Sequence, residues 1–208
     1  MQGFQSHTGV MMPLLRDNVD TDVIIPSREM RTVSKTGLLE GLFAPWRYLQ
    51  VDERVPNTDF PMNQSSFNGA SILLAGTNFG CGSSREHAVW ALMEAGFRVV
   101  IAESFATIFF NNALRNGLLP VALSREALID LMEWCAIDPQ VHRPTVDLQT
   151  GTVEAGHQQI MFEMASDART MLLSGLDEIG LTEQNRDAIE TFENQDRQRR
   201  PWIYLDQR

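Results

Sequence analysis

A segment rich in glycine and hydroxyl side chains, residues 76–88, holds the residue types best suited to chemistry in this chain. Its sequence is GTNFGCGSSREHA, in which Ser83 and Ser84 stand directly before Arg85. Three glycines within seven residues permit close approach of the backbone to a ligand. Residues 83–86 have the S-x-x-E form of a helix capping box, and the free N–H groups of a first helical turn favour an anion. The segment therefore predicts an anion site at the start of a helix.

Arg85 is an unexpected residue for that position. A cation in the first helical turn opposes the helix dipole by about 0.3–1 kcal/mol, so helix stability alone favours an acid. A guanidinium binds a carboxylate or phosphate through two parallel hydrogen bonds, which predicts an anionic ligand here. An ordinary glycine-rich turn, with Arg85 paired to a neighbouring carboxylate, explains the same residues equally well. The phosphate-loop, dinucleotide and nucleophile-elbow patterns are absent from the sequence.

A second cluster, DNVDTD at residues 17–22, places three carboxylates ahead of the apolar residues 23–25. The glycine and the distal glutamate of an EF-hand loop are missing, which argues against a dedicated calcium site. We expect an Asx-rich turn that leads into a short strand. A functional role requires one of these carboxylates to orient a partner group or to hold a catalytic histidine.

The cysteines and histidines are weaker candidates. Two cysteines, Cys81 and Cys135, are too few for a zinc finger or a four-cysteine iron–sulfur site. Cys81 lies near a predicted helix N-terminus, where thiol pKa values fall, so a nucleophilic thiol stays open as an alternative. Cys135 is expected in the core, and His87 is expected to pack rather than to act as a base. The remaining histidines, His7, His142 and His157, have no spacing typical of metal ligands.

The elements that must position residues 76–88 follow from apolar runs and turn residues. Short apolar runs predict buried strands at 71–75, 99–102 and 118–123, with helices between them at about 84–95 and 105–116. This order indicates a parallel sheet, with the glycine-rich turn at its carboxyl edge, where such sheets bind ligands. The remaining expectations are a helix from Ser124 to about Trp134, meander strands at 146–148, 152–154 and 159–164, and a helix at about 182–194 capped by Thr182.

Composition narrows the class of protein. The 208 residues carry a formal net charge of −10, which argues against a nucleic-acid surface. No apolar stretch is long enough to predict a membrane span, and no secretory leader is evident, so we expect a cytoplasmic protein with free thiols.

The segments DNVDTDVIIP and NFGCGSSREHA resemble the small subunits of 3-isopropylmalate dehydratase, in the aconitase superfamily. The resemblance continues through shorter motifs, among them GLLP at 117–120 and GLDEIGLT at 175–182, and spans nearly the whole chain. It implies an α/β fold: a swivelling β/β/α domain with a mixed, partly parallel sheet flanked by helices. Residues 1–208 would form this single domain, with 183–208 as a C-terminal helix and polar tail.

The family resemblance also implies a reaction and a partner. Such a chain is the small subunit of a heteromeric hydro-lyase in leucine biosynthesis, which interconverts 2-isopropylmalate and 3-isopropylmalate by dehydration and rehydration. A separate large subunit binds the [4Fe–4S] cluster through three cysteines, so no cofactor is expected on this chain. Self-association of the isolated chain stays open.

Individual roles carry over by position within the motifs. The resemblance makes Ser83 the general base, Ser84 and Arg85 substrate-binding residues, and Asp22 an aspartate that orders the site. Lys35 matches a further basic residue that binds substrate, although the family usually has arginine there. The loop 27–32 is also more charged than expected, which leaves dimethylmalate, citramalate or citraconate open as substrates. Two further hypotheses stay open: a non-catalytic module that binds dicarboxylates, and a hydrolase centred on Cys81.

Overall fold

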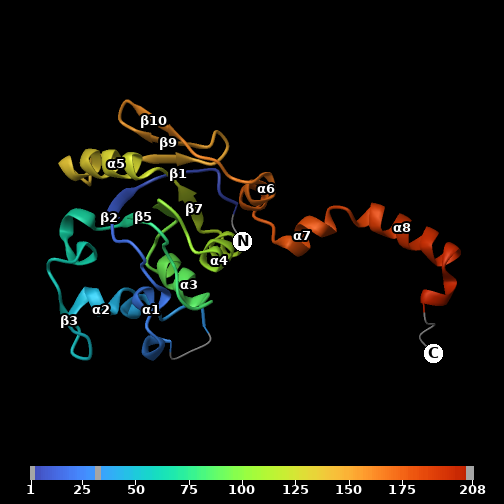
Figure 1. Cartoon of the computed structure of the whole chain (residues 1–208), viewed down its shortest axis with the longest axis horizontal. Coiled ribbons are helices and arrows are strands. Elements are labelled where there is room, and N and C mark those ends of the chain that lie inside the picture. Colours follow the sequence, from blue (N-terminus) through green and yellow to red (C-terminus); the bar gives the residue numbers. More distant parts are fainter. Residues whose placement is uncertain (1–2, 31–33, 205–208) are drawn as a thin grey trace. The chain divides into compact units, whose positions relative to one another are not determined.

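Short apolar segments of the chain form a parallel sheet that positions the glycine-rich turn (Figure 1). The computed structural model describes residues 3–30 and 34–204. The strands predicted at 71–75, 99–102 and 118–123 are confirmed, and a further strand near the N-terminus joins them. In the order in which they pair, the strands are β2 (Val10–Leu14), β5 (Ala70–Ala75), β6 (Val99–Ala102) and β7 (Leu119–Ala122).

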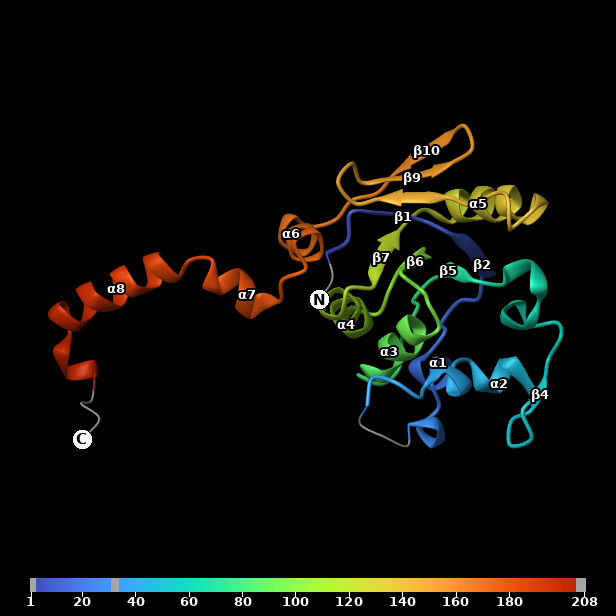
Figure 2. The ribbon, with the colours of Figure 1, turned by 180° about the vertical axis from the view of Figure 1, so that it is seen from behind.

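Both faces of this sheet are covered, which explains why its strands are apolar along most of their length. Leu73 and Val100 point into the same core as α3 (His87–Glu94) and α4 (Thr107–Asn116). The alternate residue Ile72 is also fully buried. Figures 1 and 2 show α3 and α4 on one side of the sheet and a second sheet on the other. The prediction of an α/β fold flanked by helices is confirmed, with parallel and antiparallel strands in separate sheets.

Glycines follow the ends of both helices, as is common at helix C-termini. Gly117 follows α4 with a φ of 84°, and Gly96 follows α3 with a φ of 98°, both in the left-handed region that favours glycine. Both helices begin later than expected, at His87 and Thr107. The next helix, α5 (Arg125–Ile137), begins as predicted, because the Ser124 hydroxyl accepts the Ala127 N–H at 3.3 Å.

An antiparallel sheet follows α5 and includes the predicted meander. Its third predicted strand ends at residue 161 instead of 164. Trp134 of α5 lies against Gly156, in the turn between the last two strands. The sheet is followed by α6 (Ser166–Ser174). In pairing order, its strands are β1 (Ser6–Thr8), β8 (Thr145–Asp147), β9 (Thr152–Ala155) and β10 (Gln158–Met161).

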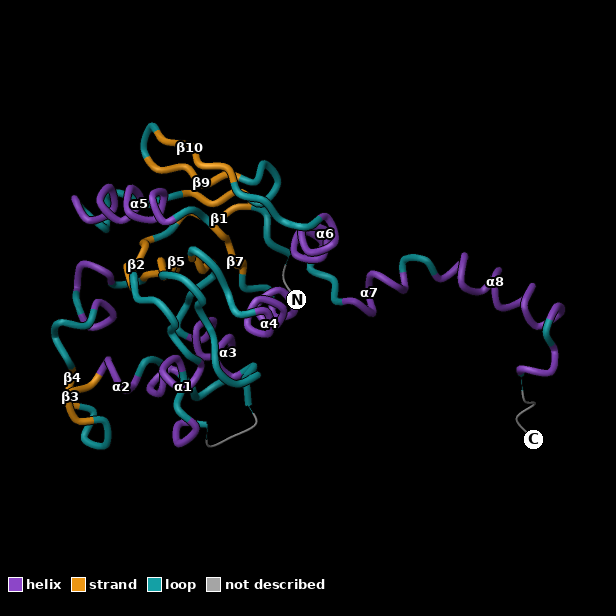
Figure 3. Tube along the Cα trace, viewed as in Figure 1, coloured by secondary structure: helices purple, strands orange, loops and turns teal. Residues whose placement is uncertain are grey.

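The chain between β2 and β5 is mostly turns and short helices, drawn in Figure 3. The strand predicted after Asp22 is wrong: this segment is the helix α1 (Thr21–Ile24), because the Asp20 carboxylate accepts the Val23 N–H at 2.8 Å and caps it. Residues 31 and 32 of the charged loop lie outside the described residues. The other elements are α2 (Ala44–Arg47), β3 (Tyr48–Gln50), β4 (Val55–Pro56) and 3-10 turns at Ser27–Glu29, Leu39–Gly41, Pro61–Asn63 and Ser65–Phe67.

Contacts divide the chain into two units, Met1–Gly175 and Leu176–Arg208. The second unit holds α7 (Glu178–Glu183), α8 (Arg186–Arg199) and a 3-10 turn at Pro201–Ile203. The single helix predicted from Thr182 is therefore wrong. Asp177 caps α7 by accepting the Gly180 N–H at 2.7 Å, whereas α8 begins after Asn185 without a side-chain cap. Within the described residues, no helix combines the length and the apolar character needed to cross a membrane.

Candidate active site

The turn between β5 and α3, residues 76–86, lies at the carboxyl edge of the parallel sheet, as predicted (Figure 3). Ser83 and Ser84 are exposed there, and Arg85 is half-buried. The side chains that could meet a ligand are therefore open to solvent rather than sealed in the core.

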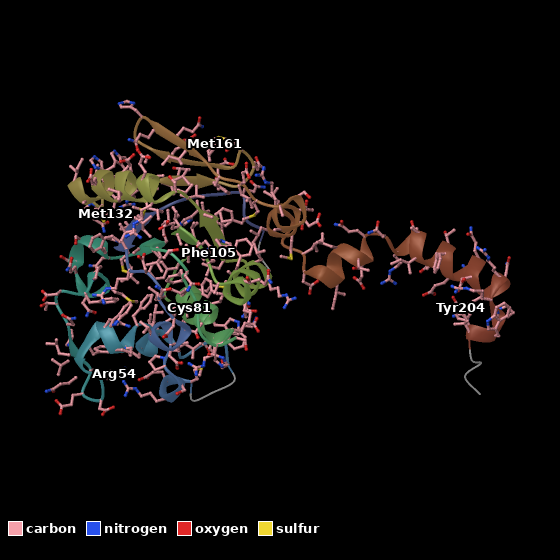
Figure 4. The ribbon with its side chains drawn as sticks, in the orientation of Figure 1. Arg54, Cys81, Phe105, Met132, Met161 and Tyr204 are labelled. Atoms are coloured by element: carbon pink, nitrogen blue, oxygen red, sulfur yellow. The ribbon has the colours of Figure 1, made fainter. Side chains whose placement is uncertain are left out.

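The first half of this turn is held by the next turn along the sheet, between β6 and α4. The Phe79 N–H donates to the Ser104 carbonyl at 2.9 Å, and the Asn78 N–H donates to the Ser104 hydroxyl at 2.8 Å. The buried Phe79 ring packs edge-on against Phe105 and Phe109. Figure 4 labels Cys81 in the first turn and Phe105 in the second. This packing fixes the backbone that leads to Ser83.

The DNVDTD segment runs along the same turn, although some sixty residues separate the two in sequence. The Gly80 N–H donates to the Val19 carbonyl at 2.8 Å, and the Thr21 N–H donates to the Cys81 carbonyl at 2.8 Å. The two segments that carry the family resemblance therefore build one site.

The three carboxylates of DNVDTD point to different partners, which explains why they form no calcium loop. Asp17 accepts from Arg125 at 2.7 Å and from the Thr77 N–H at 3.0 Å, and the hydrogen bond from Arg125 lowers the pKa of that carboxyl. Asp20 caps α1, and Asp22 pairs with Arg85. Across residues 3–30 and 34–204, no group of three or more His, Cys, Asp or Glu side chains is arranged to hold a metal.

Thr21 is a site residue that sequence reasoning missed. Its hydroxyl oxygen lies 3.1 Å from the Ser83 hydroxyl oxygen and accepts the Ser83 N–H at 3.1 Å. The Thr21 side chain is almost fully buried, at 1% exposed, so it holds Ser83 from inside. The one sequence signal was a hydroxyl residue placed between Asp20 and Asp22, and that pattern does not identify its partner.

The predicted helix cap at Ser83 is wrong. Helix α3 begins at His87, and the Ala88 and Val89 N–H groups donate to the carbonyls of Arg85 and Glu86. The first turn of α3 therefore uses these donors within the chain instead of pointing them at Ser83. The exposed Ser83 hydroxyl therefore caps no helix, and its side-chain neighbour is the Thr21 hydroxyl.

Arg85 and Asp22, both predicted site residues, form an ion pair at the surface. The Arg85 side chain is 24% exposed and that of Asp22 is 58% exposed. Ion pairs open to solvent contribute about 0–1 kcal/mol, so a ligand carboxylate can compete with Asp22 for the guanidinium. Arg85 is thus paired with a neighbouring carboxylate, as expected for an ordinary glycine-rich turn. The guanidinium nevertheless stays accessible to a ligand.

Lys35 is connected to the Ser83–Arg85 turn indirectly, through the side chains that it contacts. Its ammonium lies 3.2 Å from the Asn116 amide oxygen and 5.3 Å from the centre of the Trp90 ring. Asn116 in turn donates to the Glu86 carboxylate at 2.7 Å, next to Arg85.

The remaining candidates do not add a nucleophile. Burial and then the charge of Asp20 raise the pKa of the Cys81 thiol, so the expectation that its surroundings lower this pKa is wrong. Burial raises the pKa of Cys135 to about 12, and its predicted core position is confirmed. His87 packs on Trp90 with the ring centres 4.7 Å apart, as expected. Since an iron–sulfur cluster needs clustered thiolates, these residues do not fit one.

Comparisons with known proteins agree with this geometry. Residues 1–126 match the family model of the aconitase C-terminal domain, and residues 178–205 match that of the C-terminal domain of the 3-isopropylmalate dehydratase small subunit. The 3-isopropylmalate dehydratase small subunit of Cupriavidus necator is 53% identical over 207 residues, which is 99% of this chain and 100% of the relative. The crystal structure of 3-isopropylmalate dehydratase from Methanocaldococcus jannaschii is 28% identical, has a TM-score of 0.63, and matches 90% of this chain and 99% of its own. The chain therefore belongs to the family of 3-isopropylmalate dehydratase small subunits.

Proposed function

We propose that this chain is the small subunit of a hydro-lyase that interconverts 2-isopropylmalate and 3-isopropylmalate in leucine biosynthesis. The observation that carries the proposal is the exposed Ser83–Ser84–Arg85 turn, braced by the DNVDTD segment, in a chain 53% identical to such a subunit.

The residues of this turn are suited to binding the substrate and to moving its proton. Arg85 binds a substrate carboxylate, and Asp22 holds the guanidinium in place until the substrate arrives. Ser84 donates a hydrogen bond to the substrate. Ser83, oriented by Thr21, acts as the base in its deprotonated form: its alkoxide oxygen takes the proton from one carbon and becomes a hydroxyl.

The net chemistry is the loss and return of water. Removal of the proton and of the hydroxyl on the neighbouring carbon gives an alkene and one molecule of water. Return of the water with hydroxyl and hydrogen exchanged between the two carbons gives the isomer. Ser83 holds the abstracted proton as a hydroxyl while the alkene is present and gives it back to carbon on rehydration, so the alkoxide is regenerated.

A small subunit implies a large one, and we propose that the [4Fe–4S] cluster is bound by that partner, because the chain has two cysteines and its described residues hold no group of side chains arranged for a metal. We further propose that residues 1–208 act as a single swivel domain that presents Ser83 and Arg85 to the partner. Free cysteines suit the reducing cytoplasm as the place of assembly.

The test is reconstitution. The chain is mixed anaerobically with a 3-isopropylmalate dehydratase large subunit, and the alkene intermediate is followed by its absorbance. We expect turnover of isopropylmalate only with both subunits present, and slower turnover of dimethylmalate and citramalate. Full activity of either subunit alone, or a preference for citramalate, would contradict the proposal. Stoichiometric dicarboxylate binding by the isolated chain without any turnover would favour a binding module.

A further inference from the structure

Helix α3 and the residue that precedes it present three side chains at intervals of four residues, Glu86, Trp90 and Glu94. Residues spaced in this way lie on the same face of a helix. All three contact either the segment 34–39 or the Asn116 side chain that touches Lys35. This face of α3 is therefore a platform for the segment that carries Lys35.

The Glu94 side chain binds the backbone of that segment. One carboxylate oxygen accepts the Gly37 N–H at 2.7 Å, and the other accepts the Leu38 and Leu39 N–H groups at 2.6 and 3.1 Å. Gly37 has a φ of 87°, a conformation that glycine adopts without strain and that helps successive N–H groups to converge on one anion. Hydrogen bonds to an ionised acceptor are about twice as strong as neutral ones, so this is a firm anchor.

The Lys35 side chain, two residues before Gly37, is held by the same platform. Its ammonium lies over the Trp90 ring and beside the Asn116 oxygen, which also accepts the Trp90 indole N–H at 3.0 Å. The Asn116 amide nitrogen donates to Glu86, the neighbour of Arg85 in the chain. A continuous set of contacts thus links Glu94 to the turn that binds substrate.

We propose that Glu94 is a positioning residue for substrate binding: its carboxylate anchors residues 37–39 and so holds Lys35 against Trp90 and Asn116. This inference rests on the proposed function, in which Lys35 binds substrate. Because Glu94 acts through Lys35, its loss changes the affinity for substrate and leaves the proton transfer at Ser83 in place.

The first experiment measures steady-state kinetics of the assembled two-subunit enzyme with 3-isopropylmalate. Glu94→Gln keeps the size of the side chain but removes its charge. We expect KM to rise about tenfold, with kcat within about twofold of the unmodified enzyme. The matched control is Glu133→Gln, an equivalent charge change at an exposed position on α5, which should leave both constants unchanged.

The decisive readout is the coupling between Glu94 and Lys35. If Glu94 acts through Lys35, the double variant Glu94→Gln/Lys35→Ala should have the same KM as Lys35→Ala alone. KM effects that multiply in the double variant, or a lowered Tm with KM unchanged, would show a merely structural role and overturn the proposal.

A second readout needs no activity and separates this proposal from the proposed function. Amide hydrogen exchange of Gly37, Leu38 and Leu39 should accelerate at least about tenfold in Glu94→Gln and stay unchanged in Glu133→Gln. If the unmodified enzyme fails to turn over isopropylmalate, the proposed function is wrong, while unchanged exchange at these amides would refute the anchor itself.

Discussion

Two turns at the carboxyl edge of the parallel sheet differ in what they leave exposed. The turn after β5, residues 76–86, ends in the exposed Ser83 and Ser84. The turn after β6, residues 103–106, is short and partly buried, and it places Phe105 against Phe79. Hydrogen bonds between Phe79, Ser104 and Ala106 join the two turns.

The difference shows how a site can be both accessible and precise. The residues from Thr77 to Cys81 are fixed by the second turn and by the DNVDTD segment, whereas Ser83 and Ser84 are exposed. The turn after β6 therefore serves as a frame for the turn after β5, which carries the side chains that we propose to be reactive. Variants in the exposed half should change activity without changing stability, and variants in the frame should change both.

The largest effect is expected for Ser83→Ala. Loss of a general base lowers kcat by about a hundredfold to ten-thousandfold, and the exposed position of Ser83 predicts an unchanged Tm. Steady-state kinetics of the assembled enzyme and thermal unfolding of the isolated chain measure the two quantities. A kcat within threefold of the unmodified value would remove Ser83 from its proposed role.

The next largest loss of activity is expected for Arg85→Lys. Lysine keeps the charge but lacks the planar fork, so kcat/KM should fall about a hundredfold through lost hydrogen bonds to the carboxylate. Asp22→Asn, which breaks the same ion pair from its exposed side, should cost less than about tenfold. The reverse order of these two effects would mean that Arg85 serves the fold rather than the substrate.

Ser104→Ala tests the frame. Its hydroxyl accepts the Asn78 N–H and contacts the Thr77 hydroxyl at 2.8 Å, so its removal should lower the free energy of unfolding by about 1 kcal/mol. Activity should fall by a few-fold, because the turn that carries Ser83 loosens. Denaturant unfolding measures the first effect. Unchanged stability would show that the second turn does not brace the first.

The smallest effect is expected for Cys81→Ala. Burial and the charge of Asp20 raise the pKa of this thiol, so it is neutral at pH 7. Its thiolate forms only as the pH rises above the pKa of a free cysteine. Turnover should stay within about twofold, and alkylation near pH 8 should be slower than that of free cysteine. Rapid alkylation at pH 7 with loss of activity would instead support a cysteine nucleophile.

Sequence reasoning predicted the frame better than the contacts of the reactive groups. The strands at 71–75 and 99–102 were predictable because short apolar runs between turn residues are typical of buried strands. The S-x-x-E pattern wrongly predicted a helix cap at Ser83. The Ser83 hydroxyl lies instead against that of Thr21, a residue that only the fold brings near. The prediction of a strand after Asp22 was wrong for a local reason, because Asp20 caps a helical turn there.

The roles of Ser83 and Arg85 came from the family resemblance, and their positions on one exposed turn agree with it. The sequence held no comparable signal for Glu94, whose partners lie more than fifty residues earlier in the chain.

The most direct test of the account is a competition between two forms of this chain for one large subunit. Unmodified chain and large subunit are mixed at a fixed ratio, and Ser83→Ala is added in increasing excess under anaerobic conditions. If this turn completes the partner's active site, isopropylmalate turnover should fall in proportion to the fraction of large subunit that co-elutes with the variant. Undiminished turnover in complexes made only with Ser83→Ala would contradict the account.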